Sequence, residues 1–141
     1  MTTFDLDPLD SLTITILIDN VADLLATEKG PVKRLLPGLT SESLQPSATL
    51  EGGLAFDTLL AEHGFSALVT VEKAGRRRTV LYDAGVTPRG MVENMRRMDL
   101  SPKDVETVVL SHGHFDHTTG LEGFIGAIGG QANLPVVIHP E

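Results

Sequence analysis

A short apolar run at residues 108–110 leads directly into a segment that holds three of the five histidines of this 141-residue chain. Runs of Val and Leu bounded by polar residues are typical of a buried strand. Within the six residues that follow Ser111, the sequence places His112, His114, Asp116 and His117. The predicted strand therefore ends where three imidazoles and a carboxylate follow in close succession.

The spacing of these side chains indicates a metal site. Alternate residues of an extended segment point to the same side, so His112 and His114 can bind one ion together. Asp116 and His117 come where the backbone turns and can face a second ion. Imidazole with carboxylate suits zinc best and also iron or manganese. The alternative is a polar turn whose histidines are solvated or cap the next helix.

Size and composition are those of a globular domain with an aliphatic core. Hydrophobic residues make up 41% of the chain and charged residues 21%, which is ordinary for such a domain. The net charge of −8 disfavours a nucleic-acid partner, which requires a basic surface. No apolar stretch approaches the ~20 residues that cross a membrane, and the acidic N-terminus does not resemble a targeting segment. We therefore expect a cytoplasmic protein with a small-molecule substrate and no membrane partner.

Five segments have the composition of strands. They are residues 12–18, 66–72, 79–82, 107–110 and 135–138. The second and third are expected to form a hairpin with glycine in its turn. Apolar residues alternate at the start of the first strand, which predicts that one of its faces is turned inward.

Helical segments are predicted from caps and from apolar spacing. They are a turn at residues 21–25, a helix after Thr87-Pro88, a turn that begins at Ser101-Pro102, and a helix over residues 121–128 that ends at Gly129. Met91, Met95 and Met98 recur on one face of the second of these, at steps of three and four residues. This methionine stripe is expected to pack in the core and not to form a binding surface.

Two further segments each have two interpretations. Residues 27–49 are rich in Gly, Pro, Ser and Thr and predict a long loop, which is either a functional flap or a disordered insertion. Glu62 and His63 precede Gly64. Either His63 contacts a substrate at the mouth of the site, or the pair ends a helix that Gly64 terminates.

The histidine segment, with the strand before it and residues 118–121 after it, resembles the H-x-H-x-D-H signature of the metallo-β-lactamase superfamily. Residues 81–85 are similar to the strand-ending Asp-x-Gly of that fold. Residues 18–20, 62–66 and 138–141 resemble the branch that contains dihydropterin-ribofuranosylaminobenzene-phosphate synthases.

This resemblance implies an α+β fold, in which two mixed β-sheets form an αββα sandwich with helices on both outer faces. Residues 1–141 would be a partial domain, the N-terminal half with a mixed sheet and flanking helices. The C-terminal half would be absent, and residues 27–49 would form a flap over the site.

The resemblance also implies the roles of the site residues. His112 and His114 would bind one divalent metal ion, and Asp116 and His117 a second. Asp116 would also act in catalysis, by orienting the nucleophile or accepting its proton. Asp83 would support the metal-binding loop.

The activity implied is hydrolysis of a small, anionic ester or phosphoester by metal-activated water. The later ligands of such sites come from the second half of the fold, and His139, downstream of the cluster, is expected to be an ordinary strand-end residue. The alternative is a catalytically silent fragment, or a metal-binding interaction module that self-associates or pairs with a missing C-terminal half. A nuclease is a third alternative, which the acidic charge disfavours.

Overall fold

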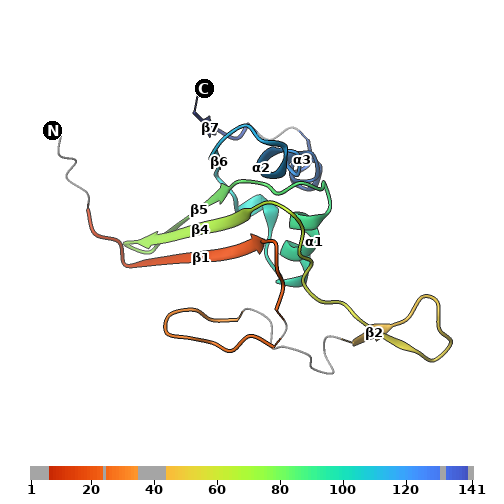
Figure 1. The fold of residues 1–141 in the computed structure, drawn as a ribbon. Coiled ribbons are helices and arrows are strands. Elements are labelled where there is room, and N and C mark those ends of the chain that lie inside the picture. The colour runs from red at the N-terminus through yellow and green to blue at the C-terminus, as the bar shows by residue number, and fades with distance from the viewer. Residues whose placement is uncertain (1–6, 24, 35–43, 131–132, 140–141) are drawn as a thin grey trace.

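The structure is a computed structural model that describes residues 7–23, 25–34, 44–130 and 133–139. Its strands are β1 (Ser11–Ile18), β2 (Leu44–Pro46), β3 (Leu54–Phe56), β4 (Ser66–Lys73), β5 (Arg76–Tyr82), β6 (Thr107–Leu110) and β7 (Val136–Ile138). Its helices are α1 (Gly90–Arg97), the short 3₁₀ helix η2 (Pro102–Asp104), α2 (Phe115–Thr118) and α3 (Leu121–Ile128). The chain therefore has the predicted α+β fold with a mixed sheet (Figure 1).

The main sheet has five strands in the order β1-β4-β5-β6-β7. The first three are antiparallel, and β5, β6 and β7 run parallel. Ala74 and Gly75 join β4 to β5 with φ angles of 50° and 73°, as in the two-residue turns that match strand twist. Because β5 and β6 are parallel, their carboxyl ends meet at one edge, which brings the residues after Tyr82 close to those after Leu110.

One face of the sheet carries the core. Met91 and Met95 of α1 and Phe124 of α3 are at most 1% exposed, and they pack with Leu81 and Val108 of the sheet. The methionine stripe is therefore core packing, as predicted. The helices of the described residues are not long and apolar enough to cross a lipid bilayer.

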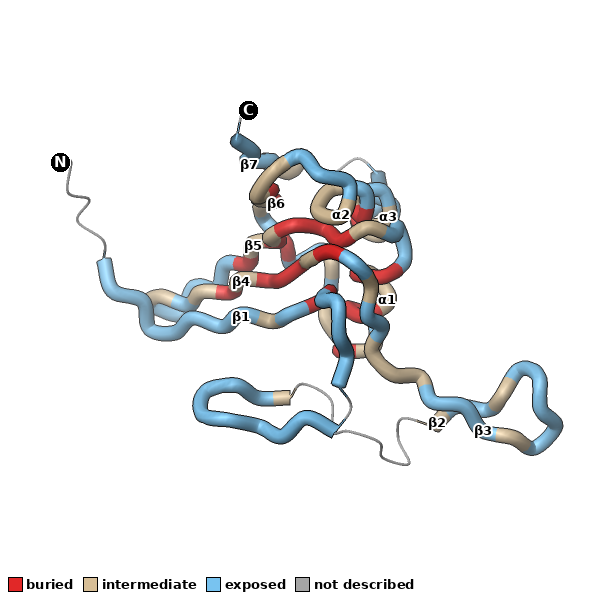
Figure 2. Tube along the Cα trace, in the orientation of Figure 1, coloured by how far each residue is buried: buried red, intermediate tan, exposed pale blue. Residues whose placement is uncertain are grey.

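The other face of the sheet is apolar but open along β1. Leu12, Ile14 and Ile16 are 57%, 59% and 44% exposed, and most of β1 is coloured as exposed in Figure 2. The prediction that one face at the start of this strand is turned inward is therefore wrong. The helices cover the opposite face, and the buried side chains of β1 are Leu17 and Ile18 at its end.

The prediction of a helical turn at residues 21–25 is also wrong, since residues 21–23 and 25 are not helical. Asp19 Oδ1 accepts a hydrogen bond from the Asn20 amide at 2.7 Å, and Asp23 Oδ1 accepts one from Leu25 at 2.8 Å. Such local bonds from carboxylates to nearby amides compete with helix formation.

The loop predicted for residues 27–49 includes a strand. Within its described part, β2 pairs with β3 in an antiparallel hairpin, and this hairpin projects from the body on the side away from α2 (Figure 1). Residues 35–43 lie outside the described residues, so the placement of a flap over the site stays a prediction.

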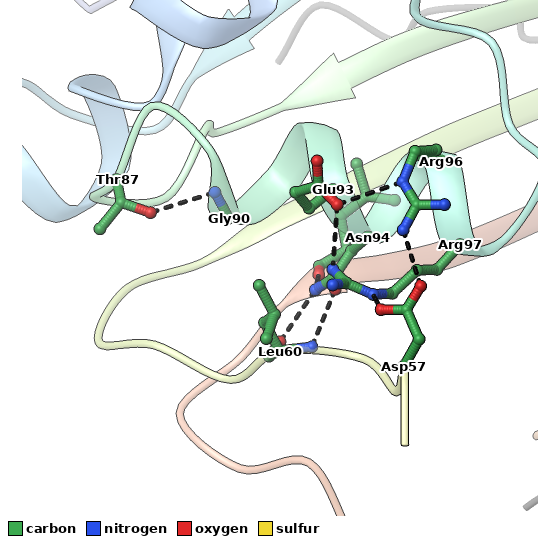
Figure 3. Close-up of polar contacts among 9 residues, drawn as sticks. Asp57, Leu60, Thr87, Gly90, Glu93, Asn94, Arg96 and Arg97 are labelled. Carbon is green, nitrogen blue, oxygen red and sulfur yellow. Dashed lines mark hydrogen bonds and ion pairs between the residues drawn. The ribbon is translucent and has the colours of Figure 1, made fainter. Parts of the chain in front are cut away.

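Residues 57–62 connect the hairpin to β4 and are fixed to α1; we call them the strap. Asp57 lies 2.8 Å from Arg96 Nη2 and 2.5 Å from Arg97 Nε. Asn94 binds both backbone groups of Leu60, each at 2.8 Å (Figure 3). The strap is therefore held by charge at one end and by a buried amide further along.

The hydrogen bonds from Arg96 and then Arg97 lower the pKa of Asp57. Its ion pairs therefore stabilise the fold above the ordinary carboxyl pKa of about 3.8, and this contribution is lost as pH falls through the lower, folded-state value. We expect Asp57→Asn to reduce the free energy of unfolding by about 1 kcal/mol at pH 7 and by much less at pH 3, in urea denaturation. Asp104→Asn, at an exposed position, is the control; a loss of equal size at both pH values would contradict the assignment.

Candidate metal centre

Asp83 follows β5 and adopts an uncommon backbone conformation. Its φ is 54°, in the left-handed region that aspartate enters more readily than most residues. Its amide donates to the Val109 carbonyl at 2.9 Å, and the residue is only 1% exposed. The turn therefore directs a buried carboxylate toward the end of β6.

The Asp83 carboxylate accepts three hydrogen bonds at that position. Oδ1 accepts from the Ser111 amide, and Oδ2 accepts from the Ser111 hydroxyl, each at 2.7 Å. Oδ2 also lies 2.7 Å from His117 Nδ1. A buried carboxylate requires such partners, so Asp83 fixes the start and the end of the histidine segment to each other.

These bonds determine which ring nitrogen carries the proton in the neutral imidazoles. A carboxylate oxygen only accepts, so His117 Nδ1 is the donor to Asp83. The Ser111 hydroxyl gives its proton to Asp83 and lies 2.9 Å from His112 Nδ1, so it accepts from that nitrogen. Both rings therefore keep a lone pair on Nε2, which is the protonation state that a metal ligand needs.

The structure brings the four predicted ligands together at the end of β6. The ring centroid of His112 lies 4.5 Å from that of His114 and 4.3 Å from that of His117. His117 Nε2 lies 3.4 Å from Asp116 Oδ2. Within the described ranges, no three His, Asp or Glu side chains are yet grouped as ligands of one ion. The donor set and its protonation fit a divalent metal.

His63 lies beside this cluster. Its Nε2 is 3.3 Å from Asp116 Oδ2, and its side chain is 73% exposed. A Cβ on Gly64 would lie 2.2 Å from the Asp116 carbonyl oxygen, and φ there is +118°, so only glycine permits this approach. No helix ends at this point among the described residues, which makes the helix-end interpretation wrong, and substrate contact by His63 stays a prediction.

Two contributors were missed in the sequence. Ser111 looks like the last residue of a strand, although a hydroxyl directly before a histidine pair was a usable signal. Glu62 contacts the backbone of Val86 and Thr87, which no local pattern could indicate. His139 is exposed after β7, as expected of a strand-end residue.

The histidine cluster at the end of β6 and the buried Asp83 that supports it are the features by which the chain can be assigned to a class of protein. Residues 61–132 match the family model of the metallo-beta-lactamase superfamily. This match spans half of the chain and includes every residue of the site described above. The chain belongs to the metallo-beta-lactamase superfamily.

Curated relatives have several activities by name. The chain is 35% identical over 81 residues to the 7,8-dihydropterin-6-methyl-4-(beta-D-ribofuranosyl)-aminobenzene-5'-phosphate synthase of Methanocaldococcus jannaschii, a match that covers 57% of this chain and 27% of the relative. It is 48% identical over 40 residues to an N-acyl homoserine lactonase of Rhizobium rhizogenes, which covers 28% of this chain and 14% of the relative. The matches thus span about a quarter of the first relative and less of the second.

Among solved structures, the chain is similar to a metallo-beta-lactamase from Novosphingobium pentaromativorans, with 24% identity and a TM-score of 0.37. That match covers 52% of this chain and 26% of the other. The Rm3 metallo-beta-lactamase gives 27% identity and a TM-score of 0.36 over the same shares of the two chains.

Replacing Asp83 by Asn tests the hydrogen-bond arrangement. The Asn side-chain oxygen can still accept from the Ser111 amide, but the NH₂ group that replaces Oδ2 cannot accept. The Ser111 hydroxyl and His117 Nδ1, which both donate to Oδ2, therefore lose their acceptor. We expect the free energy of unfolding to fall by about 2 kcal/mol, and the ¹⁵N NMR spectrum of the metal-free chain to lose the single Nδ1–H form of His117. Asp104→Asn is the control. An unchanged His117 spectrum in Asp83→Asn would contradict the assignment.

Proposed function

We propose that this chain provides metal ligands and catalytic groups of a metal-dependent hydrolase that acts on a small, anionic ester or phosphoester. The observation that carries the proposal is the Asp83–Ser111 arrangement, which leaves Nε2 of His112 and His117 able to bind a metal. Membership of the superfamily and a lactonase among the relatives support hydrolysis as the reaction class.

Four residues would hold the metal, most simply zinc, with iron or manganese as the alternatives. His112 and His114 would bind one ion, and Asp116 and His117 a second. A bound divalent ion supplies water that ionises near neutral pH and a positive charge for the substrate anion.

The side chains of the chain itself have separate tasks in this proposal. Asp83 holds His117 in position by the 2.7 Å bond to Nδ1. Asp116 presents a carboxylate oxygen within 3.4 Å of His117 and 3.3 Å of His63, so it can orient a nucleophile or accept a proton. His63 is exposed at the edge of the cluster, where it can donate a hydrogen bond to an anionic substrate.

Zinc titration of the metal-free chain tests the proposal. The parent chain is expected to bind zinc, and His114→Ala to lose at least tenfold in affinity because one imidazole ligand is removed. His139→Ala, at an exposed position after β7, is the matched control and is expected to keep the parent affinity.

Turnover of esters and phosphodiesters completes the test. We expect His114→Ala to abolish any hydrolysis that the zinc-loaded parent shows. The proposal would be contradicted if the parent bound less than about half an equivalent of zinc, or if His114→Ala and His139→Ala bound zinc with equal affinity.

A second candidate is a metal-binding interaction module that is catalytically silent alone. The open apolar face of β1, with Ile14 59% exposed, favours it, because a contiguous apolar surface commonly marks an interface. The partner would be another copy of the chain or a polypeptide that supplies a second sheet.

Sedimentation separates this candidate from a monomeric hydrolase. The parent is expected to self-associate at micromolar concentration, and Ile14→Lys to shift it toward monomer because a charge cannot be buried cheaply at an apolar contact. Val21→Lys, at another exposed apolar position outside the sheet, is the control. A monomeric, active parent would rule the candidate out.

A further inference from the structure

Glu62 places its carboxylate against the backbone that follows Asp83. Oε1 accepts from the amides of Val86 and Thr87 at 3.0 and 3.1 Å, and Oε2 accepts from the Thr87 hydroxyl at 2.5 Å. One half-buried side chain of the strap thus receives three hydrogen bonds from a loop 24 residues further along.

The space around this carboxylate depends on two glycines. A Cβ added at Gly85 would lie 2.8 Å from Glu62 Oε1, and one at Gly90 would lie 2.7 Å from Oε2. The Thr87 hydroxyl also accepts from the Gly90 amide at 3.0 Å, which joins the contact to the start of α1 (Figure 3). The loop is therefore shaped to receive a carboxylate, and Glu62 provides it.

The same loop contacts the metal-binding segment by its other end. The Ala84 amide donates to the His117 carbonyl at 2.8 Å, and the Gly85 carbonyl accepts from Gly120 at 3.1 Å. The Gly85 amide donates to Phe65, two residues beyond His63, at 2.9 Å. A shift of the loop would therefore move the backbone around the site.

The strap itself is not easily displaced. Asn94 is fully buried, and its amide group donates to the carbonyls of Leu17 and Leu60 at 2.6 and 2.8 Å. The Glu62 amide donates to the Asp19 carbonyl at 3.2 Å. Glu62 thus extends from a segment that is anchored to both β1 and α1.

We propose that Glu62 is a positioning residue of the metal centre: it fixes residues 83–87, and through them Asp83 and His117, relative to the strap that precedes His63. The inference rests on the proposed metal-binding function for its consequence and on the hydrogen bonds above for its mechanism. Within the part of the chain that the structure describes, the Glu62 side chain bonds to Val86 and Thr87 and not to a candidate ligand, so it acts through the loop.

Zinc affinity and amide hydrogen exchange test this role together, at a temperature where each variant is fully folded by circular dichroism. Glu62→Ala is expected to weaken zinc binding about tenfold. It is also expected to accelerate exchange in the metal-free chain at Val86 and Thr87, and beyond them at Ala84 and Ser111. Glu62→Gln keeps one acceptor oxygen for the two amides. It is therefore expected to keep most of the zinc affinity and most of the slow amide exchange of the parent.

Glu51→Gln, an exposed substitution on the distant hairpin, is the control and is expected to change neither property. Exchange that accelerates only at Val86 and Thr87, with zinc affinity equal to the control, would overturn the inference. If the parent binds no zinc, the proposed function fails. In that case, acceleration at Ala84 and Ser111 still supports the positioning role, and its absence overturns it.

Discussion

The buried carboxylate of Asp83 is the constraint on which the site depends. Removing a carboxylate from water costs several kcal/mol unless hydrogen bonds replace its hydration, so the turn after β5 is stable only with its donors in place. Two come from Ser111 and one from His117. The parallel pairing of β5 with β6 brings those donors within reach. The imidazoles are therefore oriented by the hydrogen bonds that the buried Asp83 carboxylate requires.

Most of the fold could be predicted because its signals are local. Strand-like composition located β4, β5 and β6, and the methionine spacing located the buried face of α1. The ligand candidates lie within six consecutive residues. The helical turn expected at residues 21–25 failed for a local reason, the side-chain bonds of Asp19 and Asp23. The other failures depend on distant parts of the chain. Which face of β1 is covered depends on where the helices cross the sheet, and the partner of Glu62 lies 24 residues away.

The two faces of the sheet have separate consequences for function. The site lies at the carboxyl ends of β5 and β6, and its bonds come from residues 62–65 and 83–120. None of these bonds involves the exposed side chains of Leu12, Ile14 and Ile16. Covering that face would therefore stabilise the sheet without being needed to orient His112 or His117, and the hydrolase and interaction hypotheses depend on different surfaces.

Support for the site consists mainly of polar groups joined to the backbone, and not of side-chain packing. Ala84 and Gly120 bind the loops to each other through backbone amides, while Glu62 and Asp83 are the carboxylates that hold the loop at its two ends. Such bonds are directional and short in range, so they define ligand positions more narrowly than apolar contacts do. They also leave the candidate ligands partly accessible, because a polar support does not need to bury them fully. A half-buried cluster that is held by the buried Asp83 and the half-buried Glu62 can therefore be reached by solvent and still be well positioned.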